Sequence, residues 1–170
     1  MKNLLLVIDM QNDFIDGSLG SKEAEKIVPK VSNEIETALK NNTAIAFTLD
    51  THTEDYLNTQ EGKKLPVKHC IKPEKGWELS PLLQDYQKKG KTYEKPTFGC
   101  TALLEDLKPY DKITLIGLCT DICVIANALL IKSFYPEKQI AVKESCCAGV
   151  TPQSHANALE AMKMCQIDII

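Results

Sequence analysis

Three polar residues stand at or just beyond the ends of apolar runs, where their types could do chemistry together. They are Asp9, Lys95 and Cys123. A cysteine is nucleophilic as the thiolate, so it needs a base or a positive field nearby. Asp9 could take the proton of Cys123, while Lys95 could keep the carboxylate ionised and stabilise the thiolate. Each residue alone is also typical of a turn, a solvated surface or a core, so only the combination predicts a cysteine nucleophile.

The segment around Cys123 predicts how an attacked carbonyl would be bound. A helix is expected over residues 121–133, which places Cys123 in its first turn. The positive end of a helix favours a thiolate and lowers its pKa. Backbone amides at the same helix start could bind the oxyanion that forms when a carbonyl is attacked.

A second group of residues has the types that bind a metal ion. Asp50 and His52 flank Thr51 after an apolar run, Glu61 lies further along, and His69 precedes a cysteine. Two imidazoles with one carboxylate suit zinc, iron or manganese. The structural alternative is that Asp50 caps a turn and both histidines are solvated.

Cys119 and Cys123 form a C-x-x-x-C pair, which also invites a redox or zinc interpretation. Redox pairs usually have C-x-x-C spacing, and a structural zinc site needs a further pair of ligands. Seven cysteines, an odd number, and an apolar run before Asp9 that is too short for a signal peptide or membrane span favour reduced thiols in the cytoplasm.

Alternating strands and helices must position these residues. Short apolar runs predict strands buried on both faces at residues 4–8, 43–49, 91–93, 112–116, 139–142 and 166–170. Helices are expected over residues 80–88, 103–108, 121–133 and 151–164, and one more from near Val28, because Pro29 fits only a first turn. The pattern predicts an α/β fold with three α/β/α layers, a Rossmann-like, mostly parallel six-stranded sheet and helices on both faces. Ligands bind beyond the carboxyl ends of such strands.

Length and charge exclude several classes. A chain of 170 residues fits one domain spanning residues 1–170, and a net charge of -3 gives no reason to expect nucleic-acid or membrane binding. The turn after the first strand lacks the G-x-G-x-x-G pattern of dinucleotide-binding proteins. The long polar stretch over residues 51–77 is expected to be a functional loop.

Three segments together resemble a known family. VIDMQNDF (7–14), KPTF (95–98) and GLCTDICV (117–124) are similar in order and spacing to the signatures of the isochorismatase-like cysteine hydrolases, in particular the nicotinamidase and pyrazinamidase branch. The resemblance spans nearly the whole chain and assigns Asp9, Lys95 and Cys123 to a catalytic triad. It also implies a cis peptide between Leu118 and Cys119, with the amides of Cys119 and Cys123 forming the oxyanion hole.

The resemblance further implies a divalent metal, zinc first and iron or manganese otherwise, held by Asp50, His52 and His69, with Glu61 as a candidate fourth ligand. It implies a small amide substrate, with nicotinamide leading, and a homo-oligomer. Phe14, Phe98 and Leu118 are the expected substrate-binding residues. The sequence departs from the family pattern at residues 64–68, KLPVK, where several nicotinamidases have a large aromatic side chain that stacks on the pyridine ring.

Two alternative functions stay open. Isochorismatase-type cleavage of a vinyl ether needs no thiol, and a glycine commonly replaces the nucleophile in true isochorismatases, so Cys123 argues against it; relatives that use a cysteine on carbamoyl or ureido groups remain candidates. A non-catalytic sensor, in which the metal site or the thiols report binding or oxidation, is the alternative from a different class.

Overall fold

A computed structural model describes residues 1–170 as one six-stranded sheet in which every neighbouring pair is parallel. In sheet order the strands are β3 (Lys91–Lys95), β2 (Ala44–Asp50), β1 (Asn3–Ile8), β4 (Lys112–Leu118), β5 (Gln139–Ala148) and β6 (Asp168–Ile169). The chain winds outward from β1 to β3, then returns to β4 beside β1 and winds the other way. The point of reversal lies between β1 and β4, and ligands in doubly wound sheets bind there.

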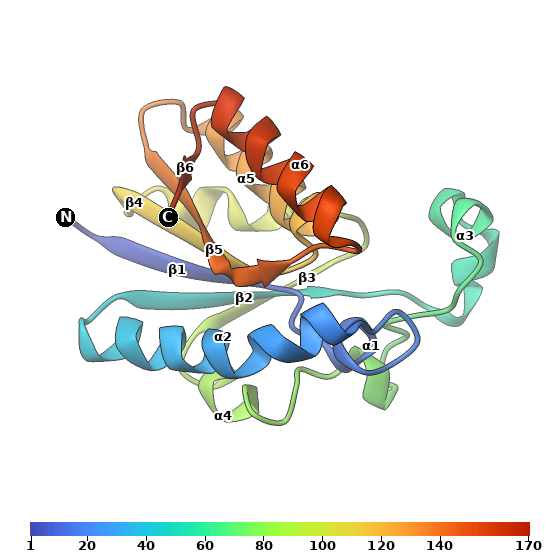
Figure 1. The fold of residues 1–170 in the computed structure, drawn as a ribbon. Coiled ribbons are helices and arrows are strands. Elements are labelled where there is room, and N and C mark those ends of the chain that lie inside the picture. The colour runs from blue at the N-terminus through green and yellow to red at the C-terminus, as the bar shows by residue number, and fades with distance from the viewer.

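Helices cover both faces of the sheet, as the sequence predicts. Figure 1 shows α5 (Ile125–Phe134) and α6 (Pro152–Met164) on one face and α2 (Lys22–Lys40) on the other. Alternate residues of β1 enter two separate apolar clusters, with Leu6 under α5 and α6 and Val7 under α2. Side chains of a strand alternate between faces, so a run that is apolar throughout is buried on both.

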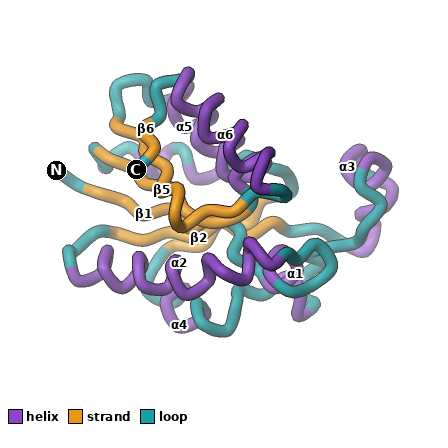
Figure 2. Tube along the Cα trace, viewed as in Figure 1, coloured by secondary structure: helices purple, strands orange, loops and turns teal.

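Two of the short helices, α1 and α3, lie beyond the carboxyl ends of the strands, as Figure 2 shows, whereas α4 precedes the start of β3. The short helices are α1 (Asn12–Ile15), α3 (Gln60–Lys64) and α4 (Gln84–Gln87). Single 3-10 turns cover Glu54–Asn58, Lys75–Trp77, Thr101–Leu103 and Glu105–Leu107, and a π-helical turn covers Thr120–Val124. The polar loop over residues 51–77 therefore contains short helical pieces and returns to the sheet edge.

All six predicted strands are present, but their ends differ from the prediction. β3, β4 and β5 extend to Lys95, Leu118 and Ala148. β6 is reduced to two residues. The extensions include polar or small residues that break the apolar run, yet the parallel ladder continues, as in the pairing of Asp50 with Lys95.

The predicted start of the first long helix near Val28 is wrong, because α2 begins at Lys22 and contains Pro29 well inside it. Ser21 caps the helix by accepting a hydrogen bond from the backbone of Ala24. Ala24 and Ile27 pack into the core beneath it, and this burial offsets the hydrogen bond that an interior proline removes. No helix of the structure, α2 included, is both long and apolar enough to cross a membrane.

Three other helix predictions need correction in type or extent. Residues 80–88 form only the single turn of α4, and residues 103–108 form 3-10 turns. The helix expected over 121–133 is a π-helical turn followed by α5, so Cys123 lies in the turn that precedes the α-helix. The last predicted helix is confirmed, with Thr151 as its N-cap in a capping box.

Candidate active site

The structure brings Asp9, Lys95 and Cys123 together at the carboxyl ends of β1, β3 and the segment after β4. Lys95 Nζ lies 2.7 Å from Asp9 Oδ2 and 3.4 Å from Cys123 Sγ. Asp9 is 0% exposed, Lys95 1% and Cys123 5%. The ammonium therefore sits between a carboxylate and a thiol in a place that solvent hardly reaches, where charges interact strongly.

The backbone at Asp9 turns the chain away from the sheet as soon as β1 ends. Asp9 has a φ of 45°, in the left-handed region that non-glycine residues seldom adopt and that often marks a functional site. Its Oδ1 accepts a 2.6 Å hydrogen bond from the Thr48 hydroxyl. Its Oδ2 has only Lys95 as a neighbour of opposite charge and is the oxygen left to receive a proton. Burial raises the pKa of Asp9, although Lys95 opposes the rise, so this carboxylate is a stronger base than an exposed one.

The thiol of Cys123 does not have the lowered pKa that a helix start predicts. Burial raises its pKa well above the ordinary value, the charge of Asp9 raises it further, and Lys95 opposes both. The expectation fails because two carboxylates, those of Asp9 and Asp50, face a thiol that has lost its solvent. Both effects favour the protonated thiol in the free protein.

The backbone next to Cys123 has a donor free for a ligand. The peptide bond between Leu118 and Cys119 is cis. The N–H of Cys119 donates to no other group of the protein, whereas its carbonyl accepts from Ile122 and Val124 in the π-helical turn. An unpaired N–H beside a nucleophile is the arrangement that an oxyanion requires.

A buried amide ties this turn to the loop after β3. Asn127, four residues after Cys123, donates to the carbonyls of Cys123 at 2.8 Å and Phe98 at 3.0 Å. Its carbonyl oxygen accepts from the N–H of Cys100 at 2.9 Å. His155, expected to hydrogen-bond at the start of its helix, contacts the hydroxyl of Thr120 at 2.8 Å and so joins α6 to the same turn.

The metal-binding residue types of the polar loop also converge. One ligand atom from each of Asp50, His52, Glu61 and His69 lies within 4.8 Å of the others. Asp50 Oδ2 is 2.9 Å from His52 Nε2 and 3.3 Å from His69 Nε2, and Glu61 Oε1 is 3.6 Å from His69 Nε2. No cysteine belongs to this group, and all seven cysteines are free thiols.

These four residues fit a divalent metal ion by the chemistry of their donors. His69 Nδ1 lies 2.9 Å from the Val67 carbonyl, so this nitrogen carries a proton, and Nε2 would offer its lone pair to a metal ion after giving up the proton that it shares with Asp50. A backbone carbonyl on the second ring nitrogen is the usual support of a metal-binding histidine. Two imidazoles and two carboxylates suit zinc, iron or manganese.

Asp50 connects the metal-binding group to the triad. Its Oδ1 lies 3.5 Å from Lys95 Nζ while its Oδ2 faces the two histidines. Burial works against ionisation of Asp50, but hydrogen bonds from His52 and His69 and the charge of Lys95 hold its pKa well below the usual range. This carboxylate therefore stays ionised, as a metal ligand must.

A small cavity of about 50 Å³ opens onto both groups. Phe14 and Phe98 line it, together with Cys119 and Cys123. Leu118 is not among the residues that line it: its side chain is 1% exposed and packs in the core under α2, and its role in substrate binding stays a prediction. The other lining residues are Leu19, Asp50, Glu61, Leu65, His69 and Ile122.

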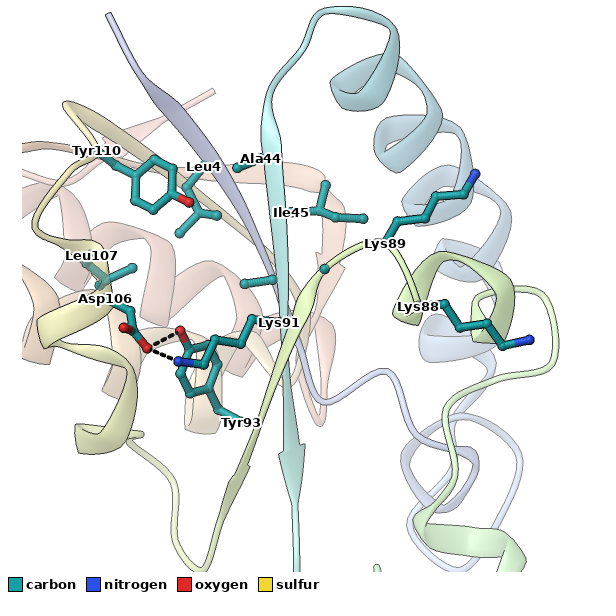
Figure 3. A pocket seen from close by; sticks show the side chains of 12 residues that line it. Leu4, Ala44, Ile45, Lys88, Lys89, Lys91, Tyr93, Asp106, Leu107 and Tyr110 are labelled. Carbon is teal, nitrogen blue, oxygen red and sulfur yellow. Dashed lines mark hydrogen bonds and ion pairs between the residues drawn. The ribbon is translucent and has the colours of Figure 1, made fainter.

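A larger cavity of about 530 Å³ lies at the amino ends of β1, β2 and β3, away from this chemistry. Figure 3 shows Lys91 and Tyr93 meeting Asp106 on its wall, while the ends of Lys88 and Lys89 point away from Leu4 and Tyr110. Asp106 neutralises the charge of Lys91, so this cavity has no free charge directed at a ligand despite its larger volume.

Sequence reasoning missed several residues of the site. Thr48, Gln11 and Asn127 are buried and polar and bind triad or metal-site groups through hydrogen bonds. Thr48 had a signal, since it is a polar residue in an otherwise apolar strand. Gln11 and Asn127 had none, because their partners are backbone groups that no side-chain pattern reveals.

Comparisons with known proteins agree with this geometry. The family model of the isochorismatase domain matches residues 3–170. A Bacillus subtilis (strain 168) protein described as the uncharacterised isochorismatase family protein PncA is 28% identical, over 94% of this chain and 93% of its own. The pyrazinamidase/nicotinamidase of Streptococcus mutans UA159 has a similar structure, with a TM-score of 0.88, 28% identity and coverage of 99% and 100%. The pyrazinamidase of Pyrococcus horikoshii in complex with zinc has a TM-score of 0.84, 25% identity and coverage of 100% and 99%.

Proposed function

The chain belongs to the isochorismatase family, and from that premise we propose that it hydrolyses the carbon–nitrogen bond of a small carboxamide, with nicotinamide as the leading substrate. The observation that carries the proposal is the buried contact of Lys95 with both Asp9 and Cys123, because Cys123 also lines a mostly apolar cavity. Similarity to a pyrazinamidase/nicotinamidase at 28% identity supports the choice of amide.

In the first step Cys123 attacks the carbonyl carbon of the amide, and its proton moves to Asp9. A forming carbon–sulfur bond lowers the affinity of sulfur for its proton, so the raised thiol pKa of the free protein does not prevent this transfer. The N–H groups of Cys119 and Cys123 bind the negative oxygen of the tetrahedral intermediate. Lys95 balances whichever of the two acidic groups carries the negative charge.

The intermediate then collapses to a thioester, and the amide nitrogen takes the proton from Asp9 and leaves as ammonia. Asp9 next removes a proton from water, which attacks the thioester. The carbon–sulfur bond breaks, sulfur regains a proton, and the carboxylic acid is released. One water is consumed and one ammonia is formed in each cycle.

Asp50, His52, Glu61 and His69 would hold a divalent metal, zinc being our proposal and iron or manganese the alternatives. When bound, such an ion offers a positive coordination point to a polar atom of the substrate. Zinc in the complex of the Pyrococcus horikoshii pyrazinamidase supports the choice. His69 contributes a protonated Nδ1 that fixes the direction of its ring.

The walls of the cavity favour a small, flat, uncharged group. Phe14 and Phe98 supply the aromatic surface, while Leu65 occupies the stretch where several nicotinamidases have a stacking aromatic. No lysine or arginine lines the cavity, and Lys95, which contacts Cys123 of its lining, is already neutralised by Asp9 and Asp50. A substrate that carries its own carboxylate would find no free cation among these side chains.

The test is a screen of small amides for ammonia release, using nicotinamide, pyrazinamide, benzamide and N-carbamoyl amino acids. We expect the pyridine and pyrazine carboxamides to be hydrolysed, Cys123→Ala to abolish the reaction, and Cys165→Ala to leave it unchanged because Cys165 is exposed and outside the cavity. If ammonia is released from N-carbamoyl amino acids and from none of the other amides, the carboxamide proposal is wrong and the protein is a carbamoyl hydrolase. An active Cys123→Ala variant would refute the nucleophile.

We also propose that the protein works in the cytoplasm as a homo-oligomer. Seven free thiols, several of them buried, support a reducing compartment. Light scattering on the purified protein tests the oligomer: a mass that is a multiple of 18.9 kDa supports it, and the monomer mass contradicts it.

A further inference from the structure

The side chain of Gln11 makes three hydrogen bonds in the interior. Its oxygen accepts from the backbone N–H of Asp50 at 2.8 Å, and its nitrogen donates to the carbonyl of Asp50 at 2.8 Å. The same nitrogen donates to the carbonyl of Trp77 at 2.8 Å. Gln11 is 0% exposed, so no water could take over these partners without opening the structure.

The contact with Asp50 continues the sheet beyond the end of β1. The ladder between β1 and β2 ends with Ile8 beside Thr48, and the last bond runs from the N–H of Asp9 to the carbonyl of Thr48. In a parallel pair, residues two apart on a strand face the same neighbour. The N–H and carbonyl of Asp50 thus point toward the β1 side, where β1 has already ended. The carboxamide of Gln11 lies there and provides the hydrogen-bond acceptor and donor that a further residue of β1 would provide.

This position of Asp50 matters because its side chain serves both halves of the site. One carboxylate oxygen faces His52 and His69, and the other faces Lys95. Without Gln11, the backbone of Asp50 would have two buried groups unpaired on its β1 side, and the end of β2 would be free to rotate or fray. A rotation of the backbone would move the carboxylate from its place between the histidines.

Gln11 also joins Asp50 to the loop that follows the last histidine ligand. The bond to Trp77 is reinforced by a backbone bridge between Gln11 and Leu79. On the other side of the site, the backbone of His52 pairs with Cys70 and Lys72. Gln11 and the backbone of His52 therefore hold the end of β2 to two parts of the loop that carries His69.

We propose that Gln11 is a positioning residue for the metal ion, because its carboxamide clamps the backbone of Asp50 and so fixes the ligand that the two histidines and Lys95 share. The inference rests on the metal site of the proposed function and deepens it. Gln11 lies two residues from the catalytic base Asp9, so a single turn of chain both supplies that base and orders the metal ligands.

The experiment compares zinc affinity in the full-length protein, freed of metal by a chelator and titrated with Zn²⁺ against a chromophoric competitor. Gln11→Met keeps the shape of the side chain and removes all three hydrogen bonds. We expect its zinc dissociation constant to rise by about 10- to 100-fold, the usual effect of losing a residue that orients a metal ligand. A Gln11→Asn variant keeps the carboxamide on a shorter stem that cannot reach both groups of Asp50, and it should weaken zinc binding in the same direction.

Asn127→Leu is the matched control. Asn127 is also 0% exposed and also makes three hydrogen bonds to backbone groups, but those groups belong to Phe98, Cys100 and Cys123 and not to a metal ligand. Both variants should lower the thermal midpoint, whereas only the Gln11 variants should lose zinc affinity. We expect the dissociation constant of Asn127→Leu to stay within about twofold of the wild type, since no ligand backbone is released.

The outcomes separate this inference from the proposed function, because zinc binding is measured without substrate. If the wild type binds zinc and a folded Gln11→Met or Gln11→Asn variant binds it equally well, the positioning role is overturned and the amidase proposal stands. If Asn127→Leu loses as much affinity as Gln11→Met, the effect is general loosening and the inference fails. If the wild type binds no zinc, the metal part of the proposed function fails and takes this inference with it.

Discussion

Lys95 is surrounded by acidic groups at the centre of the site. It contacts the carboxylates of Asp9 and Asp50 and the thiol of Cys123, and its ammonium also donates to the Thr97 carbonyl at 3.0 Å. Burial alone would lower the pKa of Lys95, but the charges of Asp9 and Asp50 raise it above its ordinary value, and Cys123 adds to the rise when its sulfur is ionised. The lysine thus stays charged, and its charge makes two nearby buried carboxylates tolerable.

Replacing Lys95 by Met should therefore destabilise the fold as well as stop the reaction. The change leaves the carboxylate of Asp9 buried beside Asp50 without its cation, and removal of one partner of a buried ion pair costs about 3 to 5 kcal/mol. Urea unfolding measures this loss of free energy, and ammonia release measures activity.

Asp9→Asn in the same protein is the control for that prediction. The double variant Lys95→Met/Asp9→Asn should recover part of the stability that Lys95→Met loses, because the uncompensated charge is gone. If the double variant loses an unfolding free energy equal to the sum of the losses in the two single variants, the ion pair is not the source of the effect.

The sequence could predict residues whose chemistry is in their own side chain and whose place is a strand end. Asp9, Lys95 and Cys123 are of this kind, and so are Asp50, His52 and His69. It could not predict that Leu118 turns into the core, because the last residue of a strand faces either side according to the ladder. Nor could it identify Gln11, whose partners are the backbone atoms of a strand 39 residues away.

Among the elements, the edge strand β3 is fastened to the 3-10 turn Glu105–Leu107 by one carboxylate. Asp106 accepts hydrogen bonds from Lys91 and from the Tyr93 hydroxyl, and these bonds lower its pKa below the ordinary value of 3.8. The unfolded chain then takes up a proton at higher pH than the folded one. The contribution of Asp106 to stability is complete above 3.8 and disappears as pH falls through the lower, folded value.

We predict that Asp106→Asn destabilises the protein at about pH 6 and has a smaller effect at about pH 3, because the wild-type carboxyl is then becoming protonated as well. Unfolding free energies of both proteins at the two pH values measure the difference. A gap between wild type and variant that stays constant or widens on acidification would contradict the assignment.

Pro29 lowers the stability of α2, and substitution by alanine should restore it. It is exposed and lies inside the helix, where it removes one hydrogen bond to the preceding turn. Alanine at this position should raise the unfolding free energy by about 2 kcal/mol, from a helix preference of about 3 kcal/mol less the gain in freedom of the unfolded chain. A thermal midpoint that does not rise in Pro29→Ala would show that the helix adapts to the proline without cost.

Element types were predictable where a long periodic pattern exists and not where tertiary contacts decide. The strands and α6 have clear apolar patterns and end signals. The sequence does not predict the start of α2, because the burial of Ala24 and Ile27 ahead of Pro29 depends on tertiary contacts that outweigh the cost of an interior proline. Residues 80–88 and 103–108 carry helical patterns too short to form stable helices without more packing.

At the scale of the whole molecule, one sheet separates two apolar clusters, and the same sheet edge supplies both halves of the site. We propose on this ground that residues 1–170 form one domain. The protein should unfold in a single transition whose midpoint is the same by circular dichroism and by tryptophan fluorescence. Two separated transitions would show that the chain contains more than one domain.

Removal of the metal should lower the unfolding free energy of the whole domain, because the four ligands join β2 to the long loop that follows it. The ligands are Asp50, His52, Glu61 and His69. Zinc at about 100 times its dissociation constant should add about 2.7 kcal/mol to the unfolding free energy. A chelator should reverse the gain, and His52→Ala should abolish it. A chelator-insensitive midpoint in a zinc-loaded sample would contradict the site.

The central claim is that Cys123 forms a covalent acyl intermediate with a small carboxamide. Mass spectrometry on enzyme quenched with acid during turnover of nicotinamide tests this most directly, with peptide mapping to locate the adduct among the seven cysteines. The account predicts an acyl group on Cys123 alone, absent from Cys123→Ala and present in Cys165→Ala. Turnover that persists in Cys123→Ala, or an adduct on a different cysteine, would contradict it.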